Sequence, residues 1–278
     1  MKKDVMIVVG AGQISLAIAR RMGYGRKIIL GDVNFDHAEK MAVLMNQAGF
    51  DVEPFAVDLS SREDIRAMIA KAQRYGEIKA MVNGAGVSPS QAPIELILKV
   101  DLYGTAILLE EVGKVIAPGG VGVTISSQSG HRMPALTPEQ DQALAMTPSE
   151  ELLDLDFLEP HKIRDTLHAY QLAKRCNEKR TMYEAVRWGE RGARINDIAP
   201  GIIVTPLAMD EFKGPRGDFY KNMFAKCPAG RPGTADEVAD VAELLMSERA
   251  QFITGATFLV DGGATASFYY GPLQPEQK

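Results

Sequence analysis

The chain has 278 residues, of which 46% are hydrophobic and 24% charged, so the composition excludes a disordered or fibrous protein. Its 36 acidic and 31 basic side chains give a net charge of −5, the wrong sign for binding nucleic acid through charge. Two cysteines are too few for a disulfide framework, and no stretch reaches the ~20 apolar residues of a membrane span. We therefore expect a cytoplasmic protein with neither nucleic acid nor membrane as partner.

Short runs rich in β-branched residues alternate with helix-length segments along the whole chain. The runs predict strands at 5–9, 27–32, 52–58, 79–83, 121–126, 194–199 and 257–260. They do not alternate strictly between apolar and polar residues, which is typical of strands buried on both faces. The sequence therefore predicts one α/β domain over residues 1–278, with a Rossmann-like, doubly wound parallel sheet of about seven strands and helices on both faces.

The first predicted strand runs into the letters GAGQIS, which open a helix. Gly10 and Gly12 allow a tight turn, and Gln13 and Ile14 begin the helix, so main-chain N–H groups meet where a pyrophosphate would bind. Ser15 occupies the third glycine position of G-x-G-x-x-G and is still small. The alternative is a tight turn that binds nothing.

Two carboxylates follow the next two strands. Asp32 comes about 20 residues after Gly10, the spacing at which a carboxylate meets the adenosine ribose. Because it would repel a 2′-phosphate and no Lys or Arg follows before Lys40, we expect NAD, with NADP less favoured. Asp58, with Leu59, is placed to flank the adenine. Each aspartate could instead cap a turn or helix. A cluster of basic residues favours NADP instead, because one of its side chains could reach a 2′-phosphate. The cluster consists of Arg20, Arg21, Arg26 and Lys27.

A Tyr followed four residues later by Lys occurs twice, at Tyr75/Lys79 and at Tyr170/Lys174. On a helix this spacing places both side chains on one face. Tyr75 precedes a glycine at a helix-to-strand junction, whereas Tyr170 lies inside a long helical run after the strand that leads into Ser127. Only the second pair has the setting of an active site.

Residues 132–164 interrupt the alternation of strands and helices with four prolines and the acidic stretch SEELLDLDFLEP. We interpret them as an insertion with one or two short helices, because so long a loop in a compact domain is usually functional. It leaves just after Ser127 and returns just before Tyr170. We therefore expect a substrate lid with a short amphipathic helix that turns Leu152, Leu155 and Phe157 inward and its carboxylates outward. The alternative is a surface or oligomer contact.

Taken in order, the motifs resemble those of the short-chain dehydrogenases/reductases of the compact single-domain type, from Val5 to about Ala264. The matching pieces are Gly10-Ala11-Gly12, Asp58-Leu59, Asn83-Gly84-Ala85-Gly86, Ser126-Ser127 with Gly130, Tyr170 with Lys174, Pro200-Gly201 with Thr205, and the closing Asp261-Gly262-Gly263. The resemblance implies that Ser127, Tyr170 and Lys174 are catalytic. It also implies cofactor contacts from Asn83, Gly84, Ala85, Tyr170, Lys174, Pro200, Gly201, Ile203 and Thr205. The Lys174 ammonium is expected to hold ribose hydroxyls as well as to lower the pKa of Tyr170.

These residue types suit carbonyl reduction, which needs a proton donor at the developing alkoxide. A tyrosine hydroxyl serves only if its pKa falls from ~10 toward the working pH, and a shift of about three units corresponds to ~4 kcal/mol. The fixed charge of Lys174 favours that shift. Ser127 would hydrogen-bond the substrate oxygen and orient it.

The sequence departs from the family pattern in two places. Asp101 stands where an Asn is usual, so either a carboxylate takes part in the proton relay or the residue only packs its helix. The gap between Ser127 and Tyr170 is also much wider than is usual. His131, at the start of the insertion, either contacts substrate or faces solvent.

The function predicted is NAD(H)-dependent interconversion of a secondary alcohol and a ketone. Apolar residues of the insertion favour a hydroxysteroid or other bulky alcohol, whereas its carboxylates favour a sugar or polyol. A nucleotide-sugar epimerase would need a C-terminal substrate domain, which the short tail after Gly263 does not provide. A non-catalytic dinucleotide sensor is the remaining alternative.

We expect no metal site and a homo-oligomer, a tetramer or dimer with two-fold symmetry. The helix that carries Tyr170 and the closing strand near 258–260 would pack between subunits. Ala185, Val186 and Trp188 would then provide the apolar surface of that helix.

Overall fold

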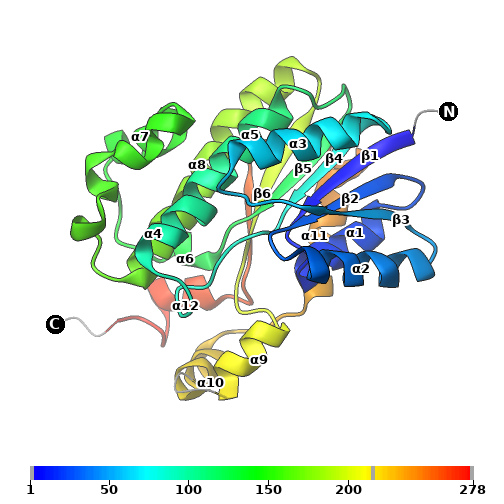
Figure 1. Ribbon diagram of the computed structural model, residues 1–278. Helices are drawn as coiled ribbons and strands as arrows, with labels where there is room; N and C mark the ends of the chain where they lie inside the picture. Colours follow the sequence, from blue (N-terminus) through cyan, green and yellow to red (C-terminus); the bar gives the residue numbers. More distant parts are fainter. Residues whose placement is uncertain (1–2, 214–216, 276–278) are drawn as a thin grey trace.

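The computed structural model describes residues 3–213 and 217–275 and contains one sheet of seven parallel strands (Figure 1). Its order is β3-β2-β1-β4-β5-β6-β7. The strands are β1 Lys3–Val9, β2 Lys27–Asp32, β3 Asp51–Ala56, β4 Gly76–Asn83, β5 Val121–Ile125, β6 Arg194–Pro200 and β7 Thr257–Val260. All seven predicted strands are present, which confirms the doubly wound α/β fold.

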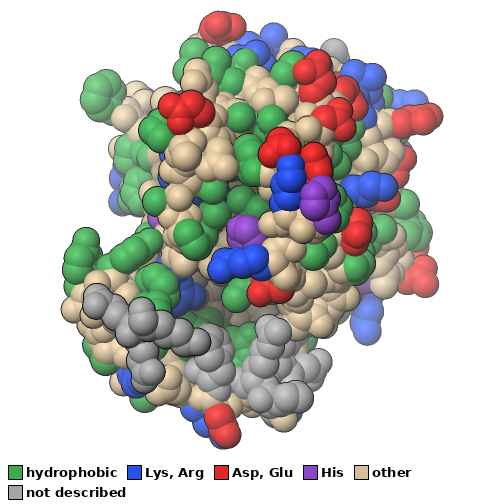
Figure 2. Space-filling view, turned by 90° about the vertical axis from the view of Figure 1, so that its left-hand side faces the viewer, with side chains coloured by type: hydrophobic (Ala, Val, Ile, Leu, Met, Phe, Trp, Pro, Cys, Tyr) green, Lys and Arg blue, Asp and Glu red, His purple; other side chains and the backbone are tan. Residues whose placement is uncertain are grey.

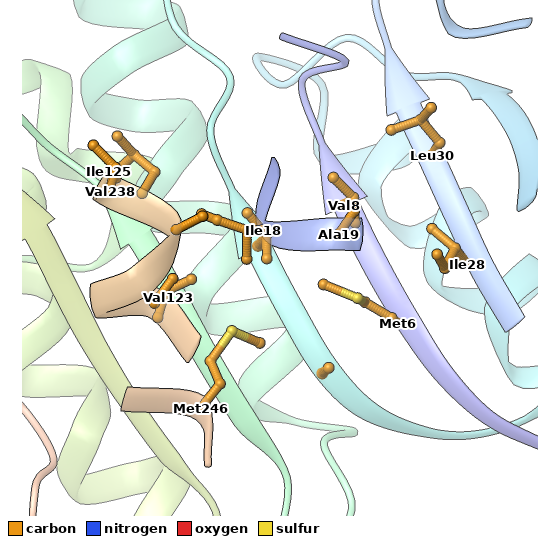
Figure 3. Packing of buried hydrophobic residues seen from close by; sticks show 14 of the residues in the cluster. Met6, Val8, Ile18, Ala19, Ile28, Leu30, Val123, Ile125, Val238 and Met246 are labelled. Atoms are coloured by element: carbon orange, nitrogen blue, oxygen red, sulfur yellow. The ribbon is translucent and has the colours of Figure 1, made fainter. Parts of the chain in front are cut away.

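Helices cover both faces of the sheet. One face carries α1 (Gln13–Met22), α2 (Phe35–Gln47) and α11 (Ala235–Met246), whose apolar side chains form one cluster with β1, β2 and β5 (Figure 3). The other face carries α3 (Arg62–Gln73), α5 (Thr105–Gly113) and α8 (Thr166–Glu190), which form a second cluster. Both faces of the strands are therefore buried, as their continuous apolar runs indicate.

Shorter elements lie around the carboxyl ends of the strands and at the periphery. They are α4 Ile94–Ile97, the π-helix η1 Leu98–Gly104, α6 Gln128–His131, α7 Pro138–Met146, α9 Pro206–Lys213, α10 Gly217–Lys226 and α12 Ala264–Tyr270. The 3-10 helices are η2 Ser149–Asp154, η3 Asp156–Leu158, η4 Pro160–Lys162 and η5 Glu248–Ala250. Helices α9 and α10 form a lobe below the sheet in Figure 1.

The third strand ends earlier than the sequence suggested. It stops at Ala56, because the Asp58 carboxylate accepts hydrogen bonds from the amide and hydroxyl of Ser60, both at 2.8 Å, and so turns the chain. The N-cap of α3 is Ser61, whose hydroxyl accepts from the Asp64 amide. Asp58 therefore holds the turn before the helix and does not cap the helix itself.

The insertion at 132–164 contains α7 and the three 3-10 helices η2, η3 and η4. Leu144, Leu152 and Leu158 are buried in one apolar cluster with side chains of η1 and α8. The expected amphipathic helix is wrong, because 3-10 turns replace it; Leu155 and Phe157 lie part-buried at the edge of this cluster. The outer surface of the segment carries acidic and basic side chains interspersed with hydrophobic ones (Figure 2).

Ion pairs fix the insertion to the main body of the domain. Arg62 of α3 binds Glu150 of η2 at 2.5 Å and Glu110 of α5 at 3.1 Å. Arg175 of α8 binds both carboxylate oxygens of Asp141 in α7, at 2.9 and 2.6 Å. Paired contacts of this kind define geometry well. The body of the insertion therefore lies on the outer side of α5 and α8.

Two of the three residues expected to give α8 an apolar outer surface are buried inside the subunit. Trp188 packs against Gly122 and donates its indole N–H to the Leu109 carbonyl at 3.2 Å, and Ala185 is also buried. That expectation is wrong for both, since their helix face turns toward the sheet. Val186 is exposed, as is Met182 one turn before it.

Within residues 3–213 and 217–275, no helix has the length and apolar character to cross a bilayer. In the same part of the chain, no three His, Cys, Asp or Glu side chains are grouped so that they could hold a metal ion. Both free cysteines, Cys176 and Cys227, are buried.

Candidate active site

The turn after β1 has the form of an anion cradle. Gly10 has a φ of 87°, and a Cβ there would come within 2.6 Å of the Ala85 amide nitrogen, so only glycine fits. Gly12 caps α1, and a Cβ on it would meet no atom within 4 Å. There is therefore open space beside Gly12, and the amides of Gln13 and Ile14, which as first-turn residues have no partner within the helix, are placed to bind a pyrophosphate there.

Ser15 performs the packing role of the third glycine. Its side chain is buried, and a Cβ on Gly84 after β4 would collide with its hydroxyl. Helix α1 and the β4 loop therefore approach as closely as a small residue permits, which supports the dinucleotide interpretation of the motif.

Asp32 ends β2 beside the glycine turn. One of its oxygens accepts from the Ala11 amide at 2.8 Å and the other from the Asn34 amide at 2.9 Å. The carboxylate is thereby held at the edge of the cradle. The cap of α2 is Asn34, whose side chain accepts from the His37 amide, so Asp32 is not the helix cap.

Three of the four basic residues near α1 have partners elsewhere. Arg21 pairs with Asp236 at 3.1 Å, Arg26 donates to the Met22 carbonyl at 2.5 Å, and Lys27 pairs with Asp51 at 2.9 Å. Lys27 begins β2 and Asp32 ends it, so roughly 16 Å of strand separates them. These three cations therefore lie away from the position of a 2′-phosphate.

The loops after β4 and β6 bring the remaining cofactor candidates to the same edge of the sheet. Asn83 donates to the Thr105 hydroxyl at 3.1 Å, and Leu59 is buried against Gly104. These two contacts fix the floor of the site. Gly84, Ala85 and Gly86 continue from Asn83, with Gly84 facing α1 and Gly86 facing α8.

The loop after β6 closes the other side of the cradle. Gly201 passes so near Asp261 that a Cβ would lie 2.7 Å from its Cα, and Ile203 forms a β-bridge with Gly233. Pro200 ends β6, immediately before this turn. The Thr205 hydroxyl accepts from the Ala208 amide at 3.2 Å at the start of α9.

Tyr170 and Lys174 lie one turn apart on α8, with the Lys174 ammonium 5.2 Å from the centroid of the tyrosine ring. Lys174 is buried and 3.5 Å from the Asp101 carboxylate. Burial lowers the pKa of Lys174, but the attraction of Asp101 and Tyr170 outweighs burial and holds that pKa above its usual range. Lys174 is therefore a fixed positive charge beside the tyrosine.

Ser127 follows β5 and caps the short helix α6, with its hydroxyl accepting from the Ser129 amide at 3.1 Å. Helix α6 lies directly against α8, because a Cβ on Gly130 would come within 3.0 Å of the Lys174 carbonyl carbon. The two elements that carry Ser127 and Tyr170 are thus packed together.

The side chains of the other Tyr–Lys pair, Tyr75 and Lys79, bind different partners. The Tyr75 hydroxyl binds Glu53, whereas Lys79 donates to the Pro118 carbonyl at 2.8 Å. The two side chains therefore serve different contacts.

Comparison with known proteins gives two family matches in sequence. The family described as short chain dehydrogenase matches residues 4–138, and the one described as Enoyl-(Acyl carrier protein) reductase matches residues 136–265. A short-chain dehydrogenase/reductase of Alternaria brassicicola is 36% identical over 96% of this chain and 97% of its own. The chain belongs to the short-chain dehydrogenases/reductases.

More distant relatives of this short-chain dehydrogenase/reductase act on different alcohols. D-threitol dehydrogenase of Mycolicibacterium smegmatis is 30% identical, covering 94% of this chain and 92% of its own. A solved 7α-hydroxysteroid dehydrogenase in complex with NADH has a TM-score of 0.74 and 21% identity, covering 94% of this chain and 93% of its own. This structural likeness supports the fold.

Asp101 is the main departure of this short-chain dehydrogenase/reductase from the family pattern. It is fully buried, and one oxygen accepts from the Val87 amide at 2.8 Å while the other faces Lys174. Burial raises the pKa of Asp101, against the attraction of the ammonium. Asp101 thus contacts Lys174 directly, which a residue that only packed its helix would not do.

Three polar residues near Lys174 were missed from the sequence. Asn177 and Glu178 of α8 and Asp197 of β6 are all buried. A signal for two of them exists: Glu178 comes one helical turn after Lys174, and Asp197 is a charge in the middle of a central strand. His131 lies against Glu178, with its Nε2 3.3 Å from the carboxylate and 26% of its side chain exposed.

Proposed function

We propose that this enzyme interconverts a secondary alcohol and a ketone with NAD(H), using Ser127, Tyr170 and Lys174. The observation that carries the proposal is the buried Lys174 ammonium directly beside the Tyr170 ring at the carboxyl edge of the sheet. With the pyrophosphate of the dinucleotide bound at the Gly10–Gly12 turn, its nicotinamide would exchange a hydride with the carbinol carbon. The test is turnover over a panel of alcohols and ketones with both cofactors.

Each residue of the set has a separate task. Tyr170 donates its hydroxyl proton to the substrate oxygen in reduction and takes it back in oxidation. Lys174 stabilises the phenolate form of Tyr170 by its charge, and Asp101 holds the ammonium in place. Ser127 donates a hydrogen bond to the substrate oxygen and so fixes its position.

The cofactor preference follows from Asp32. We expect kcat/KM with NAD to exceed that with NADP at least tenfold, because the carboxylate accepts from ribose hydroxyls and repels a 2′-phosphate. Asp32→Asn keeps an oxygen for the Ala11 amide. It should lower the ratio of kcat/KM with NAD to kcat/KM with NADP. The matched control Asp36→Asn, on the first turn of α2, should not. A wild-type preference for NADP would contradict the assignment of Asp32.

A small cavity lies beside the site, between α6, α10, α11 and the turn after β7; Gln128, next to Ser127, lines it, whereas Ser127, Tyr170 and Lys174 do not. Its apolar lining comes from Ile202, Ile203, Met223, Phe224 and Val260. None of the residues that line this cavity belongs to 132–164. The apolar residues of the insertion therefore do not support a bulky apolar alcohol as the substrate. A cyclic secondary alcohol is the first substrate class to test, in keeping with the hydroxysteroid dehydrogenase relative.

A polyol is the second substrate class. Arg231, Glu237 and Asp261 also line the cavity and offer partners for hydroxyl groups. The relative named D-threitol dehydrogenase acts, by its name, on such a compound. Comparing kcat/KM for ring alcohols and linear polyols separates the two classes.

We propose that the first residues of the insertion, and not its middle, form the substrate lid. Arg132 lies 3.6 Å from the sulfur of Met223, which lines the cavity, and its guanidinium is 5.7 Å from the Phe268 ring. The middle of the segment packs on α5 and α8 and stabilises those helices. Arg132 is therefore the part of the insertion that we propose to contact substrate.

We propose a homo-oligomer that buries the β7 edge of the sheet. Leu259 of β7 and Phe252 are exposed, and Met182 and Val186 of α8 lie near them, since Gly255 packs on the backbone of Met182. Sedimentation should show a dimer or tetramer at micromolar concentration, and Val186→Glu should weaken it. The exposed Leu167→Glu, at the far end of α8, is the control. A stable wild-type monomer would contradict this proposal.

A further inference from the structure

Arg132 is a cation beside the candidate active site that has no acidic partner. It is the C-cap of α6, and Ser127 is the N-cap of the same short helix. At a rise of about 1.5 Å per residue, their Cα atoms lie roughly 8 Å apart. The Arg132 side chain is only part-exposed, and no Asp or Glu of the described residues forms a hydrogen bond or ion pair with its guanidinium.

Two hydrogen bonds hold the backbone at Arg132 in place. The side chain of Gln171, which follows Tyr170 on α8, donates to the Arg132 carbonyl at 3.4 Å. The Tyr269 hydroxyl of α12 donates to the His131 carbonyl at 2.5 Å. Arg132 is therefore fixed between the helix that carries Tyr170 and the C-terminal helix.

The guanidinium lies at the wall of the small cavity beside the site. Its Nη1 is 3.6 Å from the sulfur of Met223, which lines that cavity, and its central carbon is 5.7 Å from the centroid of the Phe268 ring. A thioether sulfur is a weak acceptor, whereas a guanidinium has five N–H donors. Most of these donors therefore lack an acceptor among the described residues.

Asp261 is the carboxylate that attracts Arg132, but it is bound elsewhere. One of its oxygens accepts from the Gly263 amide at 2.9 Å, and the other accepts from the Thr265 amide at 2.7 Å. Asp261 thus serves the start of α12 and leaves the guanidinium unpaired.

A charge that is removed from water normally has a partner of opposite charge. Burial lowers the pKa of Arg132, as it does for a guanidinium that loses water without gaining a carboxylate. An arginine keeps its proton even so. The wall of the cavity therefore carries a positive charge that the described part of the chain does not neutralise.

We propose that Arg132 binds a carboxylate group of the substrate, which makes the substrate a hydroxy acid or keto acid. This inference rests on the proposed dehydrogenase function and gives Arg132 the role of a specificity-determining residue. The planar fork of the guanidinium matches a carboxylate with two parallel hydrogen bonds. One guanidinium balances one negative charge, and Asp261 would repel a second, so a carboxylate fits better than a phosphate dianion.

The two ends of α6 also limit the spacing of the two groups on the substrate. Ser127 would bind the reacting oxygen at one end of the helix, and Arg132 would bind the carboxylate at the other. A ring that separates hydroxyl and carboxylate suits this arrangement, whereas an acid with its hydroxyl on the neighbouring carbon does not.

The first test compares hydroxycyclohexanecarboxylates with the corresponding carboxamides, which have nearly the same shape and no charge. Wild-type kcat/KM for the acid should exceed that for the amide about tenfold or more, the usual effect of hydrogen bonds to a charged group. Arg132→Gln should bring the ratio of the two values close to one. Arg132→Lys keeps the charge but loses the fork, so it should retain part of the preference.

Arg249→Gln is the matched control for the loss of one positive charge. Arg249 is exposed on η5, next to Ser247, and the Ser247 carbonyl accepts from the side chain of Arg194 at the start of β6. It therefore lies at the edge of the sheet opposite the site. Its ratio of kcat/KM for acid and amide should equal that of the wild-type protein.

The second test needs no turnover. Cyclohexanecarboxylate, which has no hydroxyl to oxidise, should bind the NADH-loaded wild-type protein about tenfold or more tightly than cyclohexanecarboxamide in calorimetric titration. Arg132→Gln should remove this difference. If Arg132→Gln does not fold, the wild-type comparison and Arg132→Lys decide.

Equal kcat/KM for acids and amides in the wild-type protein, or a preference for acids that Arg132→Gln retains, would overturn the carboxylate site and leave the dehydrogenase function in place. If no alcohol is turned over but cyclohexanecarboxylate binding depends on Arg132, the dehydrogenase proposal fails and the carboxylate site stands.

Discussion

Tyr170→Phe should lower kcat at least 10²–10⁴-fold, the usual contribution of a positioned proton donor or acceptor. The hydroxyl carries the proton, whereas the ring still packs beside Lys174. The dissociation constant of NADH, measured by fluorescence titration, should change less than about threefold, because the cradle at Gly10 and Gly12 is untouched.

Tyr75→Phe is the matched control for this substitution. It removes the hydroxyl of the other Tyr–Lys pair, which binds Glu53 away from the cradle, so kcat should stay near the wild-type value. Activity of Tyr170→Phe within a few-fold of wild type would refute the assignment of the proton donor.

Lys174→Ala should reduce both activity and stability. The ammonium is the cation nearest to Asp101, at 3.5 Å, and it also attracts Asp197, and both acids are fully buried. Removing one partner of a buried ion pair typically costs about 3–5 kcal/mol. Denaturant unfolding should show this loss, and the loss should grow as rising pH ionises Asp197 with its pKa of about 7.

Cofactor affinity should fall as well, because Lys174 is expected to hold ribose hydroxyls. Lys79→Ala is the control. The Lys79 ammonium donates to the Pro118 carbonyl and pairs with the exposed Glu77, so its removal should leave kcat unchanged. If Lys174→Ala altered turnover but neither stability nor cofactor affinity, the buried pair with Asp101 and the ribose contact would both be wrong.

The parts that sequence predicts well are those set by local pattern. The strands were found because continuous apolar runs leave little choice but a buried parallel sheet. The Tyr170/Lys174 pair was separated from Tyr75/Lys79 because its position inside a long helix is a local property. Asp32 was placed at the glycine turn by spacing alone.

The parts that sequence missed depend on contacts between distant segments. The second half of the insertion forms 3-10 turns in place of the expected helix. These turns bring Leu152 and Leu158 to the surface of α8, and nothing local in the sequence specifies that surface. Trp188 was assigned to an outer face because its partner Leu109 lies in another helix. The position of Asp197 beside Thr124 depends on strand register, which no local pattern in the sequence specifies.

The measurement that tests the account most directly is nicotinamide absorbance while the wild-type protein and Tyr170→Phe act on a panel of secondary alcohols and ketones. With the wild-type protein, at least one cyclic secondary alcohol should reduce NAD faster than NADP, and Tyr170→Phe should abolish this activity. No turnover of any alcohol or ketone with either cofactor, in a protein that still binds NADH, would contradict it and leave a dinucleotide sensor as the function.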